Sequence, residues 1–180
     1  MAFTVQDDTG LIVDANAYIN VAFFDAYFTD LNNETAIDAE VADKQAAIIE
    51  ATQYIDDRFT YKGCPLNSVA DGQNTQFPRS DLYDGRGDLV EGLPLRLQQA
   101  TAEYALRALS GALLPDPERA DNGGQVILQR DRVEGAVETE TRYAEGVNQG
   151  ALRPFPKADR LLQQYTSGTP GGSQSFLDRA

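Results

Sequence analysis

Aromatic rings and cations alternate along residues 60–93 in a pattern that could bind single-stranded nucleic acid or the surface of a neighbouring protein. Bases stack on exposed rings, and lysine and arginine neutralise phosphates. The candidate contacts are Lys62, Phe77, Arg79, Tyr83 and Arg86. Five carboxylates share the segment and leave it with a net negative charge: Asp71, Asp81, Asp84, Asp88 and Glu91. Both interpretations of the segment therefore stay open at this point.

The composition excludes most catalytic chemistry. The chain has no histidine, and Cys64 is its one cysteine, so histidine-based triads, thiolate metal clusters and an internal disulfide are impossible. The acidic pairs Asp7-Asp8 and Asp56-Asp57 are adjacent, and neighbours on a helix point about 100 degrees apart, so we expect both pairs on the solvated surface. No glycine-rich phosphate loop occurs. We therefore expect no enzyme, no catalytic residue, no cofactor and no metal.

The charge of the chain is strongly negative and unevenly placed. The 180 residues carry a formal charge of -13, and residues 1–60 hold 12 acidic and 2 basic residues, or -10 of that total. Tight, salt-sensitive DNA binding is disfavoured, because it requires a basic surface. The acidity indicates either a solvated surface or one that repels DNA or meets a basic partner. No apolar run is long enough to span a bilayer, so we expect no contact with a membrane.

Two helices are expected before residue 60. Asn20 is a good N-cap for a helix that ends near Leu31 and carries an aromatic stripe. Thr35 and Asp38 resemble a capping box, which predicts a second helix over about 36–59. Its apolar residues recur on one side, and Lys44 lies on the opposite side, which we expect to face solvent.

The centre of the chain combines a long loop with a doubly apolar helix. Residues 60–93 are rich in glycine, proline and Asp, so we expect an irregular loop that reaches a neighbouring molecule. A helix then runs from Pro94 to about Leu109 with apolar residues on two sides. Such a helix is either central to the core or shared between subunits. The residues that would pack between subunits are Leu95, Leu97, Tyr104, Leu106 and Leu109.

The last part of the chain predicts a β-hairpin, a short helix and a tail. Residues of about 125–143 alternate in polarity around a Glu-Gly turn, and a helix follows from about 157 to 165. We therefore expect one mainly α domain over residues 1–165, a small bundle of about four helices with a hairpin and extended arms. Residues 166–180 have linker chemistry with an apolar pair near the tip, which either frays or orders on a partner.

Several runs of residues, taken in order, resemble a protein family of tailed bacteriophages. Residues 14–18 and 24–28 resemble its opening, and residues 44–56 resemble its second helix. Phe77-Pro78-Arg79 resembles the aromatic-Pro-Arg of its central loop, where the family usually has Trp. The family is labelled DnaT-like single-stranded-DNA-binding protein and is similar in structure to head-to-tail adaptor, or head-tail connector, proteins. The resemblance covers roughly residues 1–145.

The resemblance implies a structural virion protein at the head-tail junction, present in the host cytoplasm during assembly. Such a subunit forms a homo-oligomeric ring, usually of twelve copies, under the portal vertex, and links the portal protein to a tail or head-closure protein. Packaged double-stranded DNA passes through without specific binding, which an acidic channel favours. The residues expected to dock on the portal are Phe176, Leu177 and Arg179. The family label implies the alternative, a single-stranded-DNA-binding protein that uses the 60–93 loop.

Overall fold

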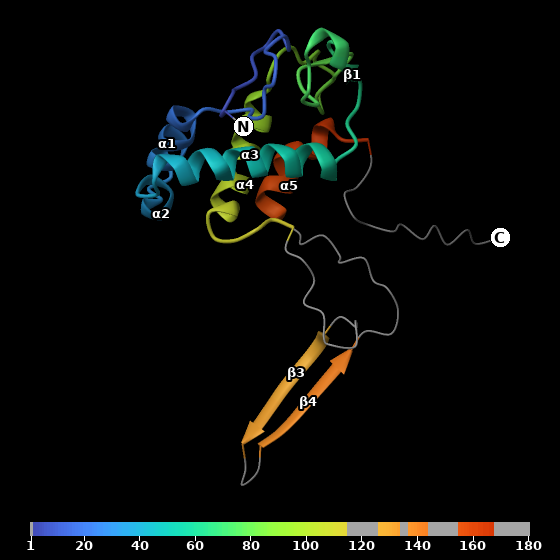
Figure 1. Cartoon of the computed structure of the whole chain (residues 1–180). Coiled ribbons are helices and arrows are strands. Elements are labelled where there is room, and N and C mark those ends of the chain that lie inside the picture. The colour runs from blue at the N-terminus through green and yellow to red at the C-terminus, as the bar shows by residue number, and fades with distance from the viewer. Residues whose placement is uncertain (1, 115–125, 134–136, 144–154, 168–180) are drawn as a thin grey trace, which may run out of the picture. The chain divides into compact units, whose positions relative to one another are not determined.

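The computed structural model describes residues 2–114, 126–133, 137–143 and 155–167, with the two hairpin strands as backbone only. The chain forms two compact units, one of residues 1–113 with 154–180 and the other of residues 114–153. The described part of the first unit holds five α-helices, and that of the second holds a two-stranded hairpin (Figure 1). The prediction of a mainly α protein with a small hairpin is therefore confirmed.

The first helix lies where the sequence predicts it. Helix α1 spans Val21–Asp30, and the Asn20 side chain accepts a hydrogen bond from the Phe23 N–H at 2.8 Å. Phe24 and Phe28 are buried, and their ring centroids lie 4.8 Å apart. Side chains four residues apart share one helix face, so this aromatic pair holds α1 on the core.

The prediction of one helix over 36–59 is wrong, because two helices occupy that stretch. Helix α2 spans Glu34–Ile37 and helix α3 spans Val41–Arg58. Asn33 caps α2 in place of the predicted Thr35, since the Asn33 side chain accepts a hydrogen bond from the Ala36 N–H at 3.2 Å. Val41 opens the new helix and is 56% exposed.

Lys44 accounts for the break between α2 and α3. We expected this side chain in solvent, yet the residue is 4% exposed and its ammonium donates to Asp25 Oδ1 and to the Ile37 carbonyl oxygen, each at 2.7 Å. In a continuous helix the Ile37 carbonyl would instead accept from the N–H four residues later. The break thus frees an acceptor for a buried lysine that ties α1, α2 and α3 together.

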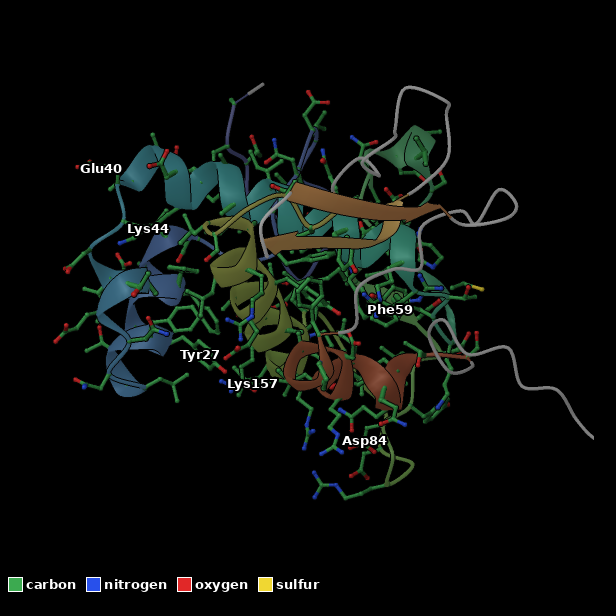
Figure 2. All side chains as sticks on the ribbon, turned by 90° about the horizontal axis from the view of Figure 1, so that it is seen from below. Tyr27, Glu40, Lys44, Phe59, Asp84 and Lys157 are labelled. Atoms are coloured by element: carbon green, nitrogen blue, oxygen red, sulfur yellow. The ribbon has the colours of Figure 1, made fainter. Side chains whose placement is uncertain are left out.

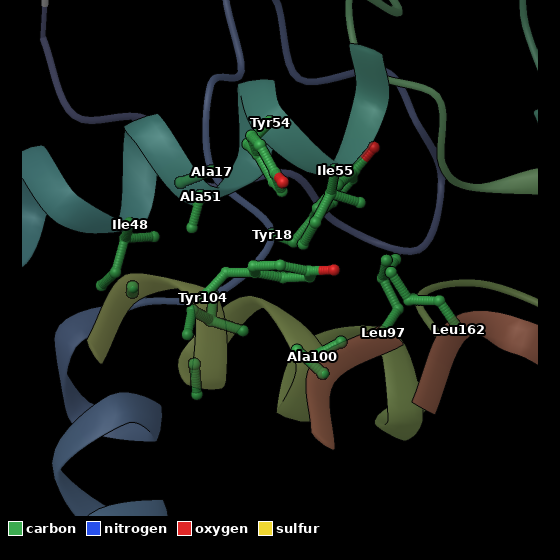
Figure 3. Packing of buried hydrophobic residues seen from close by; sticks show 14 of the residues in the cluster. Ala17, Tyr18, Ile48, Ala51, Tyr54, Ile55, Leu97, Ala100, Tyr104 and Leu162 are labelled. Atoms are coloured by element: carbon green, nitrogen blue, oxygen red, sulfur yellow. The ribbon is translucent and has the colours of Figure 1, made fainter. Parts of the chain in front are cut away.

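Helix α4 is the centre of the first unit. It spans Leu95–Ala108 and packs against α3 and against helix α5, Pro156–Leu162, which a 3₁₀ turn η2, Gln163–Tyr165, follows (Figure 1). The Tyr104 ring of α4 faces Tyr54 of α3, with 5.2 Å between the ring centroids (Figure 3). Its centroid also lies 5.6 Å from that of Phe155, the residue before α5. The predicted helices over 94–109 and 157–165 are confirmed.

The burial of α4 corrects the predicted set of subunit contacts. Leu97, Tyr104 and Leu106 are buried inside their own unit, so these three side chains are not available to a neighbouring subunit. Leu109 is partly buried against the same core. Leu95 is 60% exposed, which makes it the one member of the predicted set with most of its surface free. The doubly apolar pattern therefore reflects a central core helix.

A buried carboxylate joins three of the helices. Glu103 of α4 is 2% exposed and accepts from the Tyr27 hydroxyl of α1 at 2.9 Å and from the Lys157 ammonium of α5 at 2.5 Å. Tyr27 and Lys157 approach from the same side of the bundle (Figure 2). Burial, together with the bond to Glu103, raises the pKa of Tyr27 well above its usual range. The tyrosine therefore stays a proton donor to Glu103.

The second unit is the predicted hairpin. Strand β3 spans Val126–Val133 and strand β4 spans Val137–Tyr143, paired antiparallel. The register places Arg130 opposite Glu140 and Arg132 opposite Glu138, and an irregularity lies between residues 126 and 128. Opposite charges at paired positions stabilise a ladder. Within the described residues no further strand pairs with either edge.

Candidate functional site

The loop between α3 and α4 is folded rather than extended. Its described elements are strand β1, Cys64–Pro65, a 3₁₀ turn η1, Val69–Asp71, and strand β2, Arg79–Ser80, which pairs antiparallel with β1. The N-terminal arm, the residues before α1, is hydrogen-bonded to this loop. Asn67 Nδ2 of the loop donates to the Thr9 carbonyl of the arm at 2.7 Å, and Gln6 Nε2 of the arm donates to Thr75 Oγ1 of the loop at 3.2 Å. The loop therefore forms a fixed surface.

Arg79 lies inside this loop and not on its surface. The guanidinium donates to the carbonyl oxygens of Lys62 and Gly63 at 2.9 Å each, and to the carbonyl and side-chain oxygens of Gln76 at 3.0 and 2.9 Å. The side chain also covers the Tyr61 ring, with 5.7 Å from Cζ to the centroid. Burial lowers the pKa of Arg79, but the group stays charged because its usual value is so high. All these bonds serve the loop itself.

Phe77 is equally unavailable to a ligand. It has no exposed surface, and its ring centroid lies 4.8 Å from that of Tyr61, 6.0 Å from that of Tyr18 and 6.4 Å from that of Tyr165. The prediction of five contact residues in the loop therefore needs correction for Phe77 and Arg79. The Phe77 ring and the Arg79 guanidinium instead pack inside the loop and stabilise its fold.

The other three predicted contacts, Lys62, Tyr83 and Arg86, are exposed, and Lys62 and Arg86 lie near the turn η2. Lys62 Nζ donates to the Gln164 carbonyl at 2.9 Å, and Gly85, the residue before Arg86, lies against the Gln164 side chain. Figure 2 shows Asp84 on a loop beside α5. Tyr83, next to Asp84, is 49% exposed.

One further cation near η2 was not among the predicted contact residues. Arg96, in the first turn of α4, is exposed and close enough to Tyr165 that its charge acts to lower the pKa of that phenol, which burial raises overall. The pattern of rings and cations along residues 60–93 could not reveal Arg96 as a neighbour of Tyr165, because α4 and η2 are far apart in the sequence. We call Lys62, Arg86 and Arg96 the basic patch.

Asp84 moderates the charge of the basic patch. The N–H groups of Arg86 and Asp88 donate to Asp84 Oδ1 at 2.8 and 3.1 Å and hold its pKa below the usual value. Arg86 Nε lies 3.6 Å from the other Asp84 oxygen. Asp84 thus offsets part of the positive charge of the basic patch, and the exposed Asp88 lies in the same turn.

A groove of about 650 Å³ lies on the loop beside Tyr83. Its apolar lining comes from Leu66, Tyr83, Leu89 and Val90, and its charged lining from Asp8, Asp81, Glu91 and the buried Arg79. Gly92 closes one wall, where an added Cβ would lie 2.4 Å from Asp8 Oδ1. The groove is therefore apolar with an acidic rim, unlike the basic patch.

A second pocket, of about 260 Å³, has Asp56 of α3 in its lining. Asp56 Oδ1 accepts from the Tyr18 hydroxyl at 2.5 Å, and Oδ2 accepts from the Gln76 N–H at 3.1 Å. Burial raises the pKa of Asp56 to about 7. The expectation of a solvated Asp56-Asp57 pair is wrong for Asp56. A signal was available in the sequence, since Asp56 follows Ile48, an apolar residue of the expected core face, by eight residues and so lies on the same side of the helix.

Neither a metal centre nor a membrane helix is found in the described part of the chain. No group of three or more Cys, Asp or Glu side chains there is arranged to hold a metal ion. None of the described helices is long and apolar enough to cross a membrane. The predicted tail contacts Phe176, Leu177 and Arg179 lie outside the described residues.

The fold and the loop together define a small, mainly helical protein whose α3–α4 loop presents cations and one open aromatic ring. A family model described as "Putative DnaT-like ssDNA binding protein" matches residues 1–180. The chain therefore belongs to that family, and the match extends beyond the 1–145 region in which the resemblance was visible. No curated protein and no solved structure matches the chain.

Proposed function

We propose that the protein binds single-stranded DNA weakly through the basic patch, with Tyr83 as a stacking surface, and has no enzymatic activity. The observation that carries this proposal is the convergence of Lys62, Arg86 and Arg96 around η2 in a chain of this family. Aromatic platforms next to cations are the usual means of binding single strands without sequence preference. In this proposal the basic patch provides the cations, and Tyr83, a half-exposed residue three positions before Arg86, provides the ring.

The charge of the chain sets the strength of this binding. Three cations neutralise at most three phosphates, so the logarithm of affinity should fall with the logarithm of salt concentration with a slope of about -2. The total charge of -13 repels DNA at longer range, and this repulsion is screened at physiological salt. The repulsion limits the affinity at low salt and the loss of phosphate contacts limits it at physiological salt, so we expect weak binding at both.

Reversing two charges of the basic patch tests the proposal. Lys62→Glu with Arg86→Glu should weaken the binding of a fluorescent oligo-dT at least about tenfold at low salt, because two phosphate contacts become repulsive. Fluorescence anisotropy measures the affinity. The matched control compares single changes: Lys62→Glu in the basic patch and Arg107→Glu at an exposed site near the C-terminal end of α4, which alter the total charge equally. Equal losses in both variants would assign the effect to total charge and contradict a defined patch.

A second function, head-to-tail adaptor in a phage neck, is favoured by a separate observation. The hairpin forms its own compact unit, and within the described residues both of its outer edges lack a partner strand. An isolated hairpin is marginally stable in water, and an open edge can pair with another subunit. The acidic first third would suit a channel through which DNA slides. In this proposal the subunit forms a ring in the virion and binds the portal protein and a tail or closure protein.

Removal of residues 168–180 tests the adaptor proposal. In a ring, many weak tails act together, so loss of the tail should reduce association with purified portal rings by more than about tenfold. Co-sedimentation with portal measures this, and Leu31→Ser, at an exposed leucine after α1, serves as a control that leaves the tail intact. Native mass spectrometry should also show a ring of about twelve subunits with portal present. If the truncated chain still bound portal normally, residues 168–180 would not contribute to portal binding and the tail-docking proposal would be wrong.

A further inference from the structure

The groove beside Tyr83 has features that the proposed DNA contact does not use. Its apolar lining includes Leu66 and Leu89, which are 46% and 54% exposed, and these sit next to the half-exposed Tyr83. Large apolar side chains that remain open around one hollow indicate a surface for a partner. A volume of about 650 Å³ is within the range of roughly 300–1,000 Å³ found for ligand pockets.

The charge of the groove decides what kind of partner fits. Asp81 and Glu91 are exposed carboxylates in the lining of the groove. Arg79 is the one cation in that lining, and its guanidinium already donates to backbone carbonyl oxygens. Asp8 adds a third carboxylate, although one of its oxygens accepts from the Leu93 N–H at 2.7 Å. A phosphate chain would meet repulsion here and no free cation. A segment with lysine or arginine beside a bulky apolar residue would meet both an apolar floor and opposite charge.

We propose that this groove binds a segment of a partner protein in which bulky apolar residues alternate with lysine or arginine. The apolar side chains enter the hollow among Leu66, Tyr83 and Leu89, and the cations pair with Asp81 and Glu91. The walls are already set, because Gly92 has no room for a side chain against Asp8 and the arm and loop are hydrogen-bonded to each other. A prearranged site binds a segment without a further cost of folding the loop. This inference does not depend on DNA binding.

The test uses three labelled heptapeptides and the full chain. The probe is Gly-Lys-Leu-Arg-Leu-Lys-Gly, compared with the same peptide carrying Glu at the three basic positions or Ser at both Leu positions. Fluorescence anisotropy should detect the first peptide at micromolar protein concentrations, with at least about tenfold weaker binding of the other two. Equal binding of the first peptide and the Ser peptide would mean that only charge attracts them, and would overturn the proposed groove.

Variants then locate the peptide. Asp81→Asn with Glu91→Gln should weaken the first peptide about three- to tenfold, and Leu89→Ser about tenfold. The controls are Asp30→Asn with Glu34→Gln, two exposed acids elsewhere, and Leu95→Ser, an equally exposed leucine. A thermal melt confirms that each variant is folded. If control and groove variants lose the same affinity, the peptide does not lie in the groove.

The same variants separate the groove from the basic patch. Lys62→Glu with Arg86→Glu should weaken the binding of oligo-dT at least about tenfold and leave peptide binding intact or stronger. Asp81→Asn with Glu91→Gln should weaken the peptide about three- to tenfold and leave oligo-dT binding intact or stronger. Loss of both ligands in both variants would indicate one shared site and contradict this inference. If the natural chain bound the peptide but not oligo-dT, only the DNA-binding proposal would be wrong.

Discussion

Replacing Arg79 with lysine will lower the free energy of unfolding by about 3 kcal/mol. The guanidinium satisfies backbone oxygens of Lys62, Gly63 and Gln76, and a lysine ammonium at the end of a flexible stem cannot reach all of them together. A buried acceptor left without a donor costs about 1–3 kcal/mol. The low end of this range, about 1 kcal/mol for each of the three carbonyls, applies because Lys62 and Gly63 are exposed residues and their bonds to Arg79 are only partly buried.

Urea unfolding measures this loss, and Arg96→Lys provides the control. Arg96 is an exposed arginine, so its replacement should change the free energy of unfolding by less than about 0.5 kcal/mol. The slope of the unfolding free energy against urea concentration should stay the same in both variants if unfolding exposes the same amount of surface. A loss below about 1 kcal/mol for Arg79→Lys would show that the four hydrogen bonds do not hold the loop.

The consequence for function distinguishes a structural Arg79 from a DNA contact. Lys62 belongs to the basic patch, and its carbonyl is one of the acceptors of Arg79. Loosening the loop should therefore weaken oligo-dT binding only as far as it displaces Lys62. Low temperature, which leaves the variant fully folded, should restore most of that binding. A direct phosphate contact of Arg79 would instead be kept by lysine at all temperatures, since both side chains are cations.

Local signals explain which parts of this fold the sequence could predict. Helix α1 needs only the Asn20 cap and an aromatic stripe, and the hairpin needs alternation around a turn. Both are properties of a few consecutive residues. The α2–α3 break could not be found in this way, because it depends on Lys44 reaching Asp25 on another helix. A lysine among acidic residues is typical of a solvated face, and only the packing of α1 reverses that inference.

The loop shows the same limit for the candidate site. The prediction recognised that rings and cations are concentrated there, but it treated all five as exposed. Whether Phe77 faces solvent depends on Tyr61 of the same loop and on Tyr18 and Tyr165, which come from two other segments. Arg96 was missed for the complementary reason, since it joins Lys62 only after α4 and η2 pack together. Residue types indicated the chemistry, and tertiary contacts decided which residues can perform it.

The stability of the protein should fall as the pH rises from about 4 to about 7, because Asp56 must lose a proton in a buried site. Burial is the main cause that raises its pKa from 3.8 to about 7, with Asp57 adding repulsion, while the bonds to Tyr18 and Gln76 and the charge of Arg79 act in the opposite direction. Between these two values the folded state holds a proton that the unfolded state has released. The free energy of unfolding therefore decreases with pH across this range.

The size of the effect follows from the size of the shift. A difference of roughly three units at about 1.4 kcal/mol each gives an upper limit of about 4 kcal/mol between pH 4 and pH 8. The chain has no histidine, whose ordinary pKa would fall in this range. The carboxyls of Asp7 and Asp84 have lowered pKa values, so their contributions change below pH 4. Urea unfolding at pH 5, 6, 7 and 8 should thus record mainly Asp56.

Asp56→Asn separates this titration from the rest of the protein. The amide has the shape of the neutral acid: its oxygen can accept from the Gln76 N–H while its NH₂ donates to the Tyr18 oxygen, which already accepts from the Phe77 N–H at 3.2 Å. We expect the variant to match the natural chain within about 1 kcal/mol at pH 5 and to exceed its stability by about 2 kcal/mol or more at pH 8. Asp57→Asn, at the exposed neighbour, should keep most of the slope. An Asp56→Asn variant that retained the full pH dependence would place the titrating group elsewhere.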